Sequence, residues 1–407
     1  MSATSAHAAA PREASRLEGF DWYPWALAAV VLLTRVLTRS QLYFVDGPKH
    51  VKAILNHTYL IQPPGYWLFN RLMGLFSDPV LAISVFNISC SVLGVVVFYY
   101  CARCFFAHRS FAMWGAAIYA GVFYAWFSAE IHCTYAAQLL FPVLVLYGFL
   151  QHERTGRAWY LYLAAVAFGI GAGMRPSDGA FLLPFVCWRL IRLRPRHRAL
   201  IACAVITVVC LAWLVPTALA YQRLHWSSLS TQYPGSVGTY FVRQTSQESI
   251  VAKGFNFQTL ANVTRVVAAL SFAFWPFLLP LVIRRGKGLD SRAVDLAIWI
   301  VPGLLFFLVG YFGHAPHLNF MTAPLILVGL LLLENCTQRL TITTAVLCLA
   351  WNIGFFLFFR PIITSSLPVN VINVYAGRCT WFSLRHQAQA DLHEVLKNPA
   401  WLLGDKP

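Results

Sequence analysis

The chain carries little charge. Only 11% of its 407 residues are charged and only 15 are acidic, whereas 58% are hydrophobic and the mean hydropathy is +0.61. A soluble domain carries about 25% charged residues, so this composition excludes an ordinary soluble protein. No polar stretch is long enough to form a large soluble domain. Any chemistry is therefore expected in or beside a membrane.

Acidic residues are also scarce relative to basic ones, which gives a net charge of +16. Such a charge by itself could indicate a nucleic-acid partner. The basic residues lie in short clusters between apolar runs, however, which is where a polytopic membrane protein places them. We therefore expect no nucleic-acid partner. Residues 1–21 lack the apolar core of a signal peptide, so the first apolar run is expected to remain as a helix.

Apolar runs of a length that can cross a bilayer dominate the rest of the chain. They predict an all-α polytopic membrane protein with about eleven transmembrane helices. The expected spans are Tyr23–Thr38, Val80–Cys104, Ala112–Ser128, Tyr135–Leu150, Ala158–Gly173, Gly179–Leu193, Leu200–Tyr221, Leu260–Ile283, Val294–Phe312, Leu318–Leu333 and Thr341–Phe359.

The distribution of arginine and lysine predicts the orientation. With the N-terminal tail, residues 1–21, in the cytoplasm, the basic clusters all fall in inner loops, and the short outer loops hold almost nothing basic except Arg175. The chain then divides into a first transmembrane module at 22–221, with an outer loop at 39–79, a second outer loop at 222–259, C-terminal helices at 260–360 and an outer tail at 361–407. The inner basic residues are Arg103, Arg109, Arg154, Arg157, Arg189, Arg192, Arg194, Arg196, Arg198, Arg284, Arg285, Lys287, Arg292 and Arg339.

The first outer loop is expected to contain two short amphipathic helices that lie on the membrane. One is predicted over Pro48–Asn56. The other is predicted to begin at Pro63-Pro64, a favourable position for proline. Its apolar face would be Tyr66, Trp67, Phe69, Leu72, Met73 and Phe76.

Ionisable residues gather on the outer face. Asp46 is the most informative, because a carboxylate just beyond a membrane helix is costly and is a functional candidate. The remaining outer polar residues are Lys49, His50, Lys52, His57, Gln62, Glu130, His132, Arg175, Ser177, Asp178, His314, His317 and Asn319. Their convergence predicts an active site that opens outward.

Several motifs occur in a family-specific order. The acidic Asp46 is followed by Gln62-Pro63-Pro64-Gly65-Tyr66-Trp67, then by the polar segment Ser128–Tyr135, then by Gly173-Met174-Arg175-Pro176. In this order the chain resembles the GT-C superfamily of membrane glycosyltransferases. Within it, the chain is similar to bacterial relatives of protein O-mannosyltransferases and of lipid A aminoarabinose transferases.

The resemblance implies transfer of a sugar from a polyprenyl-phosphate carrier to a glycan, lipid or protein acceptor outside the plasma or bacterial inner membrane. A carboxylate can serve as general base toward an acceptor hydroxyl, and Asp46 is that candidate, with Glu130 assisting. Cations stabilise a leaving phosphate, and the candidates are Arg175, Lys49 and Lys52. The candidate substrate contacts are His50, Gln62, Tyr66, His132 and His317. An inverting reaction without metal or other cofactor is expected.

Simpler roles remain open for the same residues. Asp46 and Asp178 are both suitable helix caps, and Glu130 and His132 could pair with each other. His314 and His317 alone are weak evidence for a metal site. A transporter or lipid flippase is a second reading of the chain. An inactive GT-C-like scaffold is a third, because Asp46-Gly47 stands where many members of the superfamily carry Asp-Glu.

Overall fold

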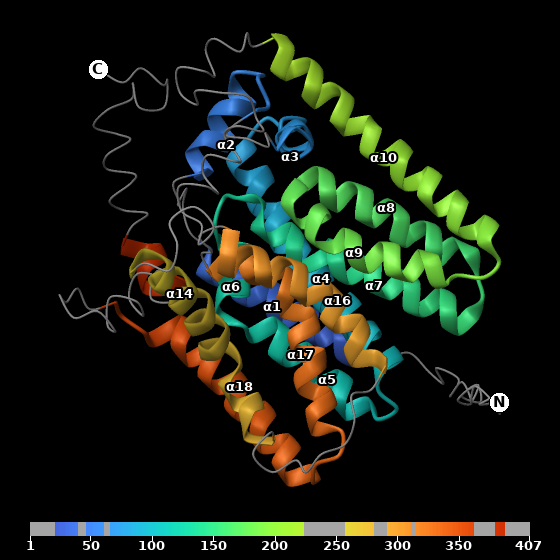
Figure 1. Cartoon of the computed structure of the whole chain (residues 1–407). Coiled ribbons are helices and arrows are strands. Elements are labelled where there is room, and N and C mark those ends of the chain that lie inside the picture. Colours follow the sequence, from blue (N-terminus) through green and yellow to red (C-terminus); the bar gives the residue numbers. More distant parts are fainter. Residues whose placement is uncertain are drawn as a thin grey trace.

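The structure is a computed structural model that describes residues 21–39, 46–60, 66–223, 257–280, 291–310, 315–361 and 379–386. Within these residues it is helical and contains no strand. Each of the eleven apolar runs coincides with a helix, a helix broken in two, or a helix with a short 3₁₀ or π segment at its end (Figure 1). The all-α fold predicted from the sequence is confirmed.

The first half of the chain forms a bundle of helices packed around α4 (Pro79–Phe105). α4 lies against α7 and α1, and α8 lies between α7 and α10. α4 and α7 pack so closely that a Cβ atom added at Gly94 would lie 2.3 Å from the Leu139 carbonyl oxygen. The other bounds are α1 Tyr23–Thr38, α5 Arg109–Gly121, α6 Phe123–Glu130, α7 Ala137–Thr155, α8 Ala158–Met174, α9 Pro176–Arg192 and α10 Arg196–Arg223.

The expected third span is bent by 53° between α5 and α6. The bend exposes backbone groups that a straight helix would pair. Asn352, on the last long helix, accepts a hydrogen bond from the Phe123 backbone N–H at 3.2 Å and donates one to the Ala273 carbonyl at 2.9 Å. A side chain from the C-terminal half therefore stabilises a break in the N-terminal half.

The C-terminal helices pack beside this bundle (Figure 1). Five described helices are long and apolar enough to cross a membrane, or six if the bent α5–α6 pair is one span. Three further apolar helices are shorter, so the count of eleven spans stays a prediction. The bounds here are α14 Phe257–Phe274, η2 Trp275–Leu278, α16 Ser291–Leu305, η3 Phe306–Gly310, η4 Ala315–Leu318, α17 Asn319–Leu333 and α18 Gln338–Phe358.

Two short helices, α2 (Asp46–Leu55) and α3 (Trp67–Met73), lie at one end of the bundle (Figure 1). Both were predicted, although α3 begins only after Tyr66, whose φ of 54° is left-handed; Pro63 and Pro64 lie outside the described residues. The apolar face of α3 is not simply turned toward lipid. Phe69 and Met73 are buried against the protein core, while Phe76 is exposed.

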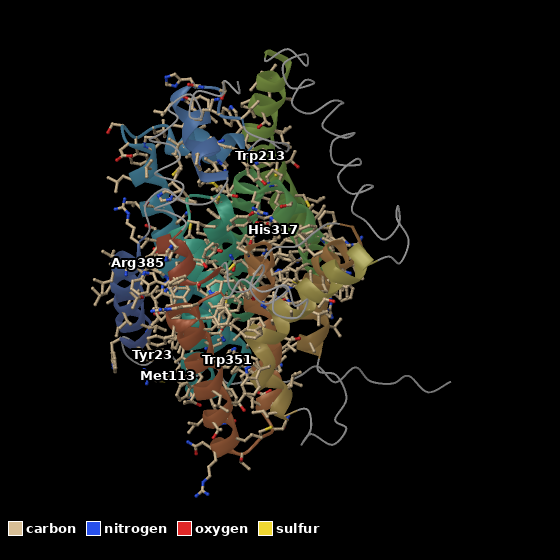
Figure 2. The ribbon with its side chains drawn as sticks, turned by 90° about the vertical axis from the view of Figure 1, so that its left-hand side faces the viewer. Tyr23, Met113, Trp213, His317, Trp351 and Arg385 are labelled. Atoms are coloured by element: carbon tan, nitrogen blue, oxygen red, sulfur yellow. The ribbon has the colours of Figure 1, made fainter. Side chains whose placement is uncertain are left out.

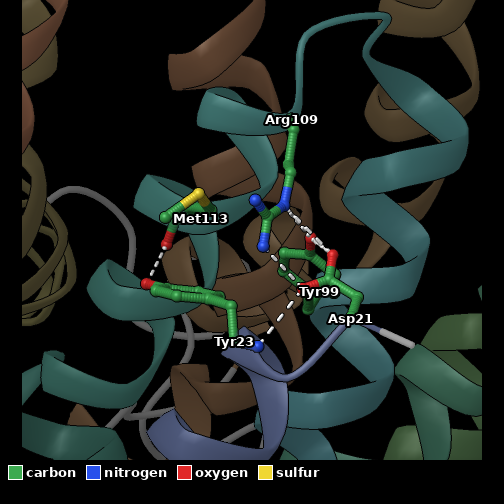
Figure 3. A network of polar contacts seen from close by, with 5 residues as sticks. All are labelled: Asp21, Tyr23, Tyr99, Arg109 and Met113. Carbon is green, nitrogen blue, oxygen red and sulfur yellow. Dashed lines mark hydrogen bonds and ion pairs between the residues drawn. The ribbon is translucent and has the colours of Figure 1, made fainter. Parts of the chain in front are cut away.

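At the opposite end of the bundle, a polar network joins the start of the chain's first helix to its neighbours (Figure 3). Asp21, before α1, accepts hydrogen bonds from Tyr99 and from Arg109, whose Nη2 and Nε lie 2.7 and 3.1 Å from the two carboxylate oxygens. Tyr23 donates to the Met113 carbonyl at 2.8 Å. Burial would raise the pKa of Asp21, but the hydrogen bonds from Arg109 and Tyr99 more than offset it and hold the pKa below the usual value. The start of α1 is thereby joined to α4 and α5.

Candidate functional site

The candidate site is built around the segment Ser128–Tyr135, which connects α6 to α7 and is buried throughout. The side-chain amide of Asn87, on α4, donates to the carbonyls of Ile131 and Cys133 at 2.6 and 3.1 Å. These bonds satisfy backbone acceptors that would otherwise be unpaired inside the protein. The segment is therefore held in one conformation, and its polar side chains point to defined partners.

Glu130 faces the C-terminal end of α1. Its Oε1 accepts a hydrogen bond from the Thr38 hydroxyl at 2.7 Å, and the Trp126 indole N–H donates to the same hydroxyl at 3.0 Å. The fully buried Arg35 stacks its guanidinium 4.2 Å above the Trp126 ring and donates to the Ala120 carbonyl at 2.6 Å. Arg35 also interacts electrostatically with Glu130. A buried carboxylate with a nearby cation is what a tuned acid or base requires.

His132 points the other way, toward α4. One of its ring nitrogens, Nε2, lies 2.9 Å from the Ser84 hydroxyl. Its other ring nitrogen, Nδ1, is buried and has no hydrogen-bond partner among the described residues. Burial, together with the positive charge of Arg39, lowers the pKa of His132 to about 4, against a smaller opposing influence of Asp78. His132 is therefore neutral near pH 7.

Arg175 lies at the turn between α8 and α9, with only 5% of its surface exposed. Its Nε donates to Asp178 at 3.2 Å and its Nη1 to the Thr134 hydroxyl at 3.3 Å. The guanidinium also sits 4.3 Å from the centre of the Tyr135 ring. Asp178 accepts a second, shorter hydrogen bond, 2.7 Å, from the Gln138 amide. Two consecutive residues of the polar segment, Thr134 and Tyr135, thus contact Arg175.

His317, on η4, joins the same group from the C-terminal half. Its Nε2 lies 3.0 Å from the Tyr135 hydroxyl, and its ring stacks on Phe307. Figure 2 shows His317 at mid-height, below Trp213 and above Tyr23 and Met113, and its side chain is buried. Asn319 adds a second link, donating to the Ser128 hydroxyl at 2.7 Å.

Of the residues predicted in the first outer loop, Lys49, His50 and Lys52 lie on α2, and Tyr66 immediately precedes α3. His50 is buried and shares a 2.7 Å hydrogen bond with Asn70, so it joins α2 to α3. Tyr66 packs against His50 and interacts electrostatically with Arg175. Lys49 and Lys52 are half-buried on α2.

Three predicted residues lie partly or wholly outside the described residues. Asp46 is the first residue of α2, which is compatible with either a cap or a catalytic role. Its side chain, like the whole of Gln62 and His314, lies outside the described residues. The structure therefore shows where the Asp46 backbone starts the helix and no more.

Two of the simpler readings are wrong. Glu130 and His132 do not pair with each other, because successive turns of the segment direct them toward α1 and α4 respectively. Asp178 does not cap α9, whose N-cap position is Arg175; its carboxylate is the ion partner of that arginine. Among the described residues, no group of three or more His, Cys, Asp or Glu side chains could hold a metal ion.

Several polar neighbours were not anticipated, namely Arg35, Thr38, Ser84, Asn87 and Gln138. All of them lie in or next to apolar runs, where the sequence was interpreted only as membrane-spanning. Arg35 carries the clearest signal, since a charged residue within a membrane helix is rare and faces the protein interior.

Comparison with known proteins shows a family match over the region that contains most of the candidate site. Residues 61–219 match the family model described as dolichyl-phosphate-mannose-protein mannosyltransferase. This region contains Ser128–Tyr135, Arg175 and Asp178. No curated protein matches the chain.

Two solved structures are similar to it. ArnT from Cupriavidus metallidurans, bound to undecaprenyl phosphate, has a TM-score of 0.53 at 17% identity, covering 79% of this chain and 61% of ArnT. An oligosaccharyltransferase from Archaeoglobus fulgidus, tethered to an acceptor peptide, has a TM-score of 0.49 at 14% identity, covering 90% of this chain and 55% of the enzyme.

The chain thus spans about three fifths of the length of ArnT. The likeness to ArnT is one of fold, and the family model independently matches the region that holds most of the candidate site. Together with the apolar helices, these findings describe a multi-pass membrane protein whose fold is similar to that of ArnT.

Proposed function

We propose that this protein is a glycosyltransferase that moves a sugar from a polyprenyl-phosphate-linked donor to an acceptor on the extracytoplasmic face of the membrane. The observation that carries the proposal is the convergence of Thr134, Tyr135, Arg175 and His317 in one buried polar group of a GT-C-like fold, with Glu130 on the same buried segment. A lipid-phosphate donor is supported by the match to the dolichyl-phosphate-mannose-protein mannosyltransferase model and by the undecaprenyl phosphate bound to ArnT.

Asp46 is the proposed general base. It starts α2, a helix that packs on α3 and α4 at the same end of the bundle as the polar group. A carboxylate there could accept the proton of an acceptor hydroxyl as the sugar is transferred. Glu130 would orient the acceptor or share this task, because its carboxylate is fixed by Thr38. A single displacement of this kind inverts the anomeric centre.

Arg175 is the proposed partner of the leaving phosphate. A guanidinium has five N–H donors, so the contacts with Asp178 and Thr134 do not exhaust it. Those contacts fix its orientation, and a fixed cation stabilises developing negative charge without reorganising during the reaction. Lys49 and Lys52 on α2 would add further positive charge near the phosphate. No divalent ion is required in this scheme.

The test compares lipid-linked sugars and cell-envelope glycans by mass spectrometry in a deletion strain that expresses either the wild type or Asp46→Asn. Removing a general base lowers the rate by about 10²–10⁴-fold. We expect one sugar-sized mass to disappear from an acceptor on deletion, to return with the wild type and to stay absent with Asp46→Asn.

Asp78→Asn is the matched control. Asp78 is an exposed carboxylate at the same end of the bundle, where it caps α4 by accepting from the backbone of Val80 and Leu81 at 2.9 and 3.0 Å. Asparagine is as good an N-cap as aspartate, so this variant should keep its stability and leave transfer intact. Full complementation by Asp46→Asn would show that Asp46 is only a helix cap. If deletion changes no sugar mass at all, the scaffold or transport readings take precedence.

A further inference from the structure

The end of the bundle opposite the candidate site contains a basic cavity. It is about 300 Å³ in volume and lies where α7 ends, α9 ends and α10 begins. α7 runs from the candidate site to this cavity, and its 19 residues separate the two by about 28 Å. The lining residues are His152, Glu153, Gly156, Arg189, Arg192, Leu193, Arg194 and Arg198.

The four arginines of this cavity have different surroundings. Arg189 is neutralised, because Asp295 and Glu153 lie 2.6 and 2.7 Å from its guanidinium. Arg198 instead donates to the Gly156 carbonyl at 2.9 Å, and Arg194 donates to the Leu193 carbonyl at 3.1 Å. Contacts with carbonyls orient a guanidinium without cancelling its charge.

Arg192 is accessible, with 59% of its side chain exposed, and its Nη1 is 3.8 Å from Asp295. At that separation the ion pair is weak, since Asp295 is already bonded to Arg189 and to the Trp188 indole. The cavity therefore carries excess positive charge, which comes from Arg192, Arg194 and Arg198. All three arginines line the same cavity.

Exposed apolar and aromatic residues lie within three positions of the lining residues along the chain. Ile191 on α9 and Leu200 on α10 are 73% and 70% exposed. Trp159, at the start of α8, is also exposed and stacks on Tyr160. Aromatic rings at the end of a membrane helix mark the level of the lipid headgroups. The cavity therefore lies where a headgroup would be, and the exposed aliphatic side chains lie where acyl chains would begin.

We propose that this cavity binds the phosphate-bearing headgroup of an anionic phospholipid, held by Arg192, Arg194 and Arg198, with Ile191 and Leu200 against its acyl chains. Basic pockets between membrane helices bind anionic headgroups by charge and by guanidinium–phosphate hydrogen bonds. The site is separate from the proposed transfer reaction and does not depend on it. By the positive-inside rule it belongs to the cytoplasmic leaflet.

The test uses the purified full-length protein in mild detergent. Phosphatidylglycerol, phosphatidylcholine or inorganic phosphate is added, and bound lipid is counted by native mass spectrometry while the unfolding temperature is recorded. We expect phosphatidylglycerol to bind and to raise the unfolding temperature, and phosphatidylcholine to do neither. Arg192→Gln/Arg198→Gln should weaken phosphatidylglycerol binding about 30-fold, from the loss of two charges.

The matched control is Arg157→Gln/Arg339→Gln, which removes two exposed arginines that do not line the cavity. It should bind phosphatidylglycerol like the wild type. Arg192→Lys/Arg198→Lys keeps the charge and should retain most of the binding, which separates lost charge from misfolding. Equal weakening by the control pair, or none by the cavity pair, would overturn the proposal. Equal stabilisation by inorganic phosphate and by phosphatidylglycerol would make this a free-phosphate site and overturn the lipid assignment.

Discussion

At the scale of single residues, the polar side chains of Ser128–Tyr135 are each stabilised by one or two specific partners in apolar surroundings. A buried polar group without a partner costs about 1–3 kcal/mol, so these pairings decide both the shape and the stability of the candidate site. His132 and Arg175 illustrate two ways in which an ionisable side chain can be buried. The histidine is kept neutral, whereas the arginine is kept charged and paired.

His132 gives the protein a specific sensitivity to acid. An unfolded histidine has a pKa of about 6.5, whereas burial lowers the pKa of His132 to about 4. Between these values the unfolded chain binds a proton that the folded protein does not, so stability is full above pH 6.5 and falls as the pH is lowered. The loss attributable to His132 is about 2 kcal/mol at pH 5.

The measurement is the unfolding temperature of wild type and His132→Gln at pH 7.5 and pH 5. Glutamine keeps a hydrogen-bonding group near Ser84 but does not titrate. The variant should lose less stability than the wild type between the two pH values. Identical losses in the two proteins would show that His132 does not contribute.

Asp178 is expected to be essential for stability because of Arg175. Removing one member of a buried ion pair leaves the other charge uncompensated, which costs about 3–5 kcal/mol. Asp178→Asn should therefore unfold at a much lower temperature than the wild type. The double variant Arg175→Met/Asp178→Leu should recover part of this loss, because it buries no charge. If the double variant is less stable than Asp178→Asn, the pair itself stabilises the fold.

At the scale of helices, the packing of α4 on α7 depends on Gly94. A Cβ atom there would lie 2.3 Å from the Leu139 carbonyl oxygen, which is backbone and cannot move aside alone. Small residues allow this close approach of membrane helices. Gly94→Ala should lower the free energy of unfolding by about 1–3 kcal/mol, measured by thermal unfolding in detergent.

Gly354, four residues before the end of α18, is the control, because a Cβ atom there meets nothing within 4 Å. Alanine also favours the helix over glycine by about 1 kcal/mol. Gly354→Ala should therefore leave the stability unchanged or raise it. Equal destabilisation by both substitutions would mean that the cost at Gly94 does not arise from contact with Leu139.

The sequence predicts helices well here and contacts less well. Length and hydropathy place every long helix among the described residues, because a membrane helix satisfies its own backbone and needs no partner to be recognised. The break at Val122 is not visible in this way, since Ala112–Ser128 is uniformly apolar and the bend depends on Asn352, over 200 residues away. The start of α3 differs for a similar reason, because Tyr66 adopts a left-handed conformation that proline-based rules do not anticipate.

The candidate site likewise contains residues that the sequence predicts and residues that only the structure identifies. Glu130, His132, Arg175 and His317 are visible in the sequence as ionisable residues between apolar runs. Thr38 bonds Glu130, Ser84 bonds His132, and Gln138 bonds Asp178, the ion partner of Arg175. These three are uncharged residues in or beside those runs, and only the packing of the helices identifies them. Sequence patterns therefore find the charged groups of the site but not the groups that orient them.

At the scale of the whole molecule, the inner-loop arginines predict a cytoplasmic N-terminus, and eleven spans place the C-terminus on the other side. Alkaline phosphatase, which folds actively only outside the cytoplasm, should be active when fused after Pro407 and inactive when fused after Arg157. Activity at neither position, or at both, would contradict the odd number of spans.

The hydrogen bonds of Asn352 have a consequence for biosynthesis. A ribosome delivers helices in order, so α5 and α6 reach the membrane long before α18 exists. Until then the Phe123 N–H has no Asn352 to bond, and an unpaired backbone group in hydrocarbon is unfavourable. The region matched by the family model can thus be inserted early but reaches its final conformation only after the last long helix has arrived. A chain cut between the two halves should be rescued by supplying the missing half as a separate polypeptide.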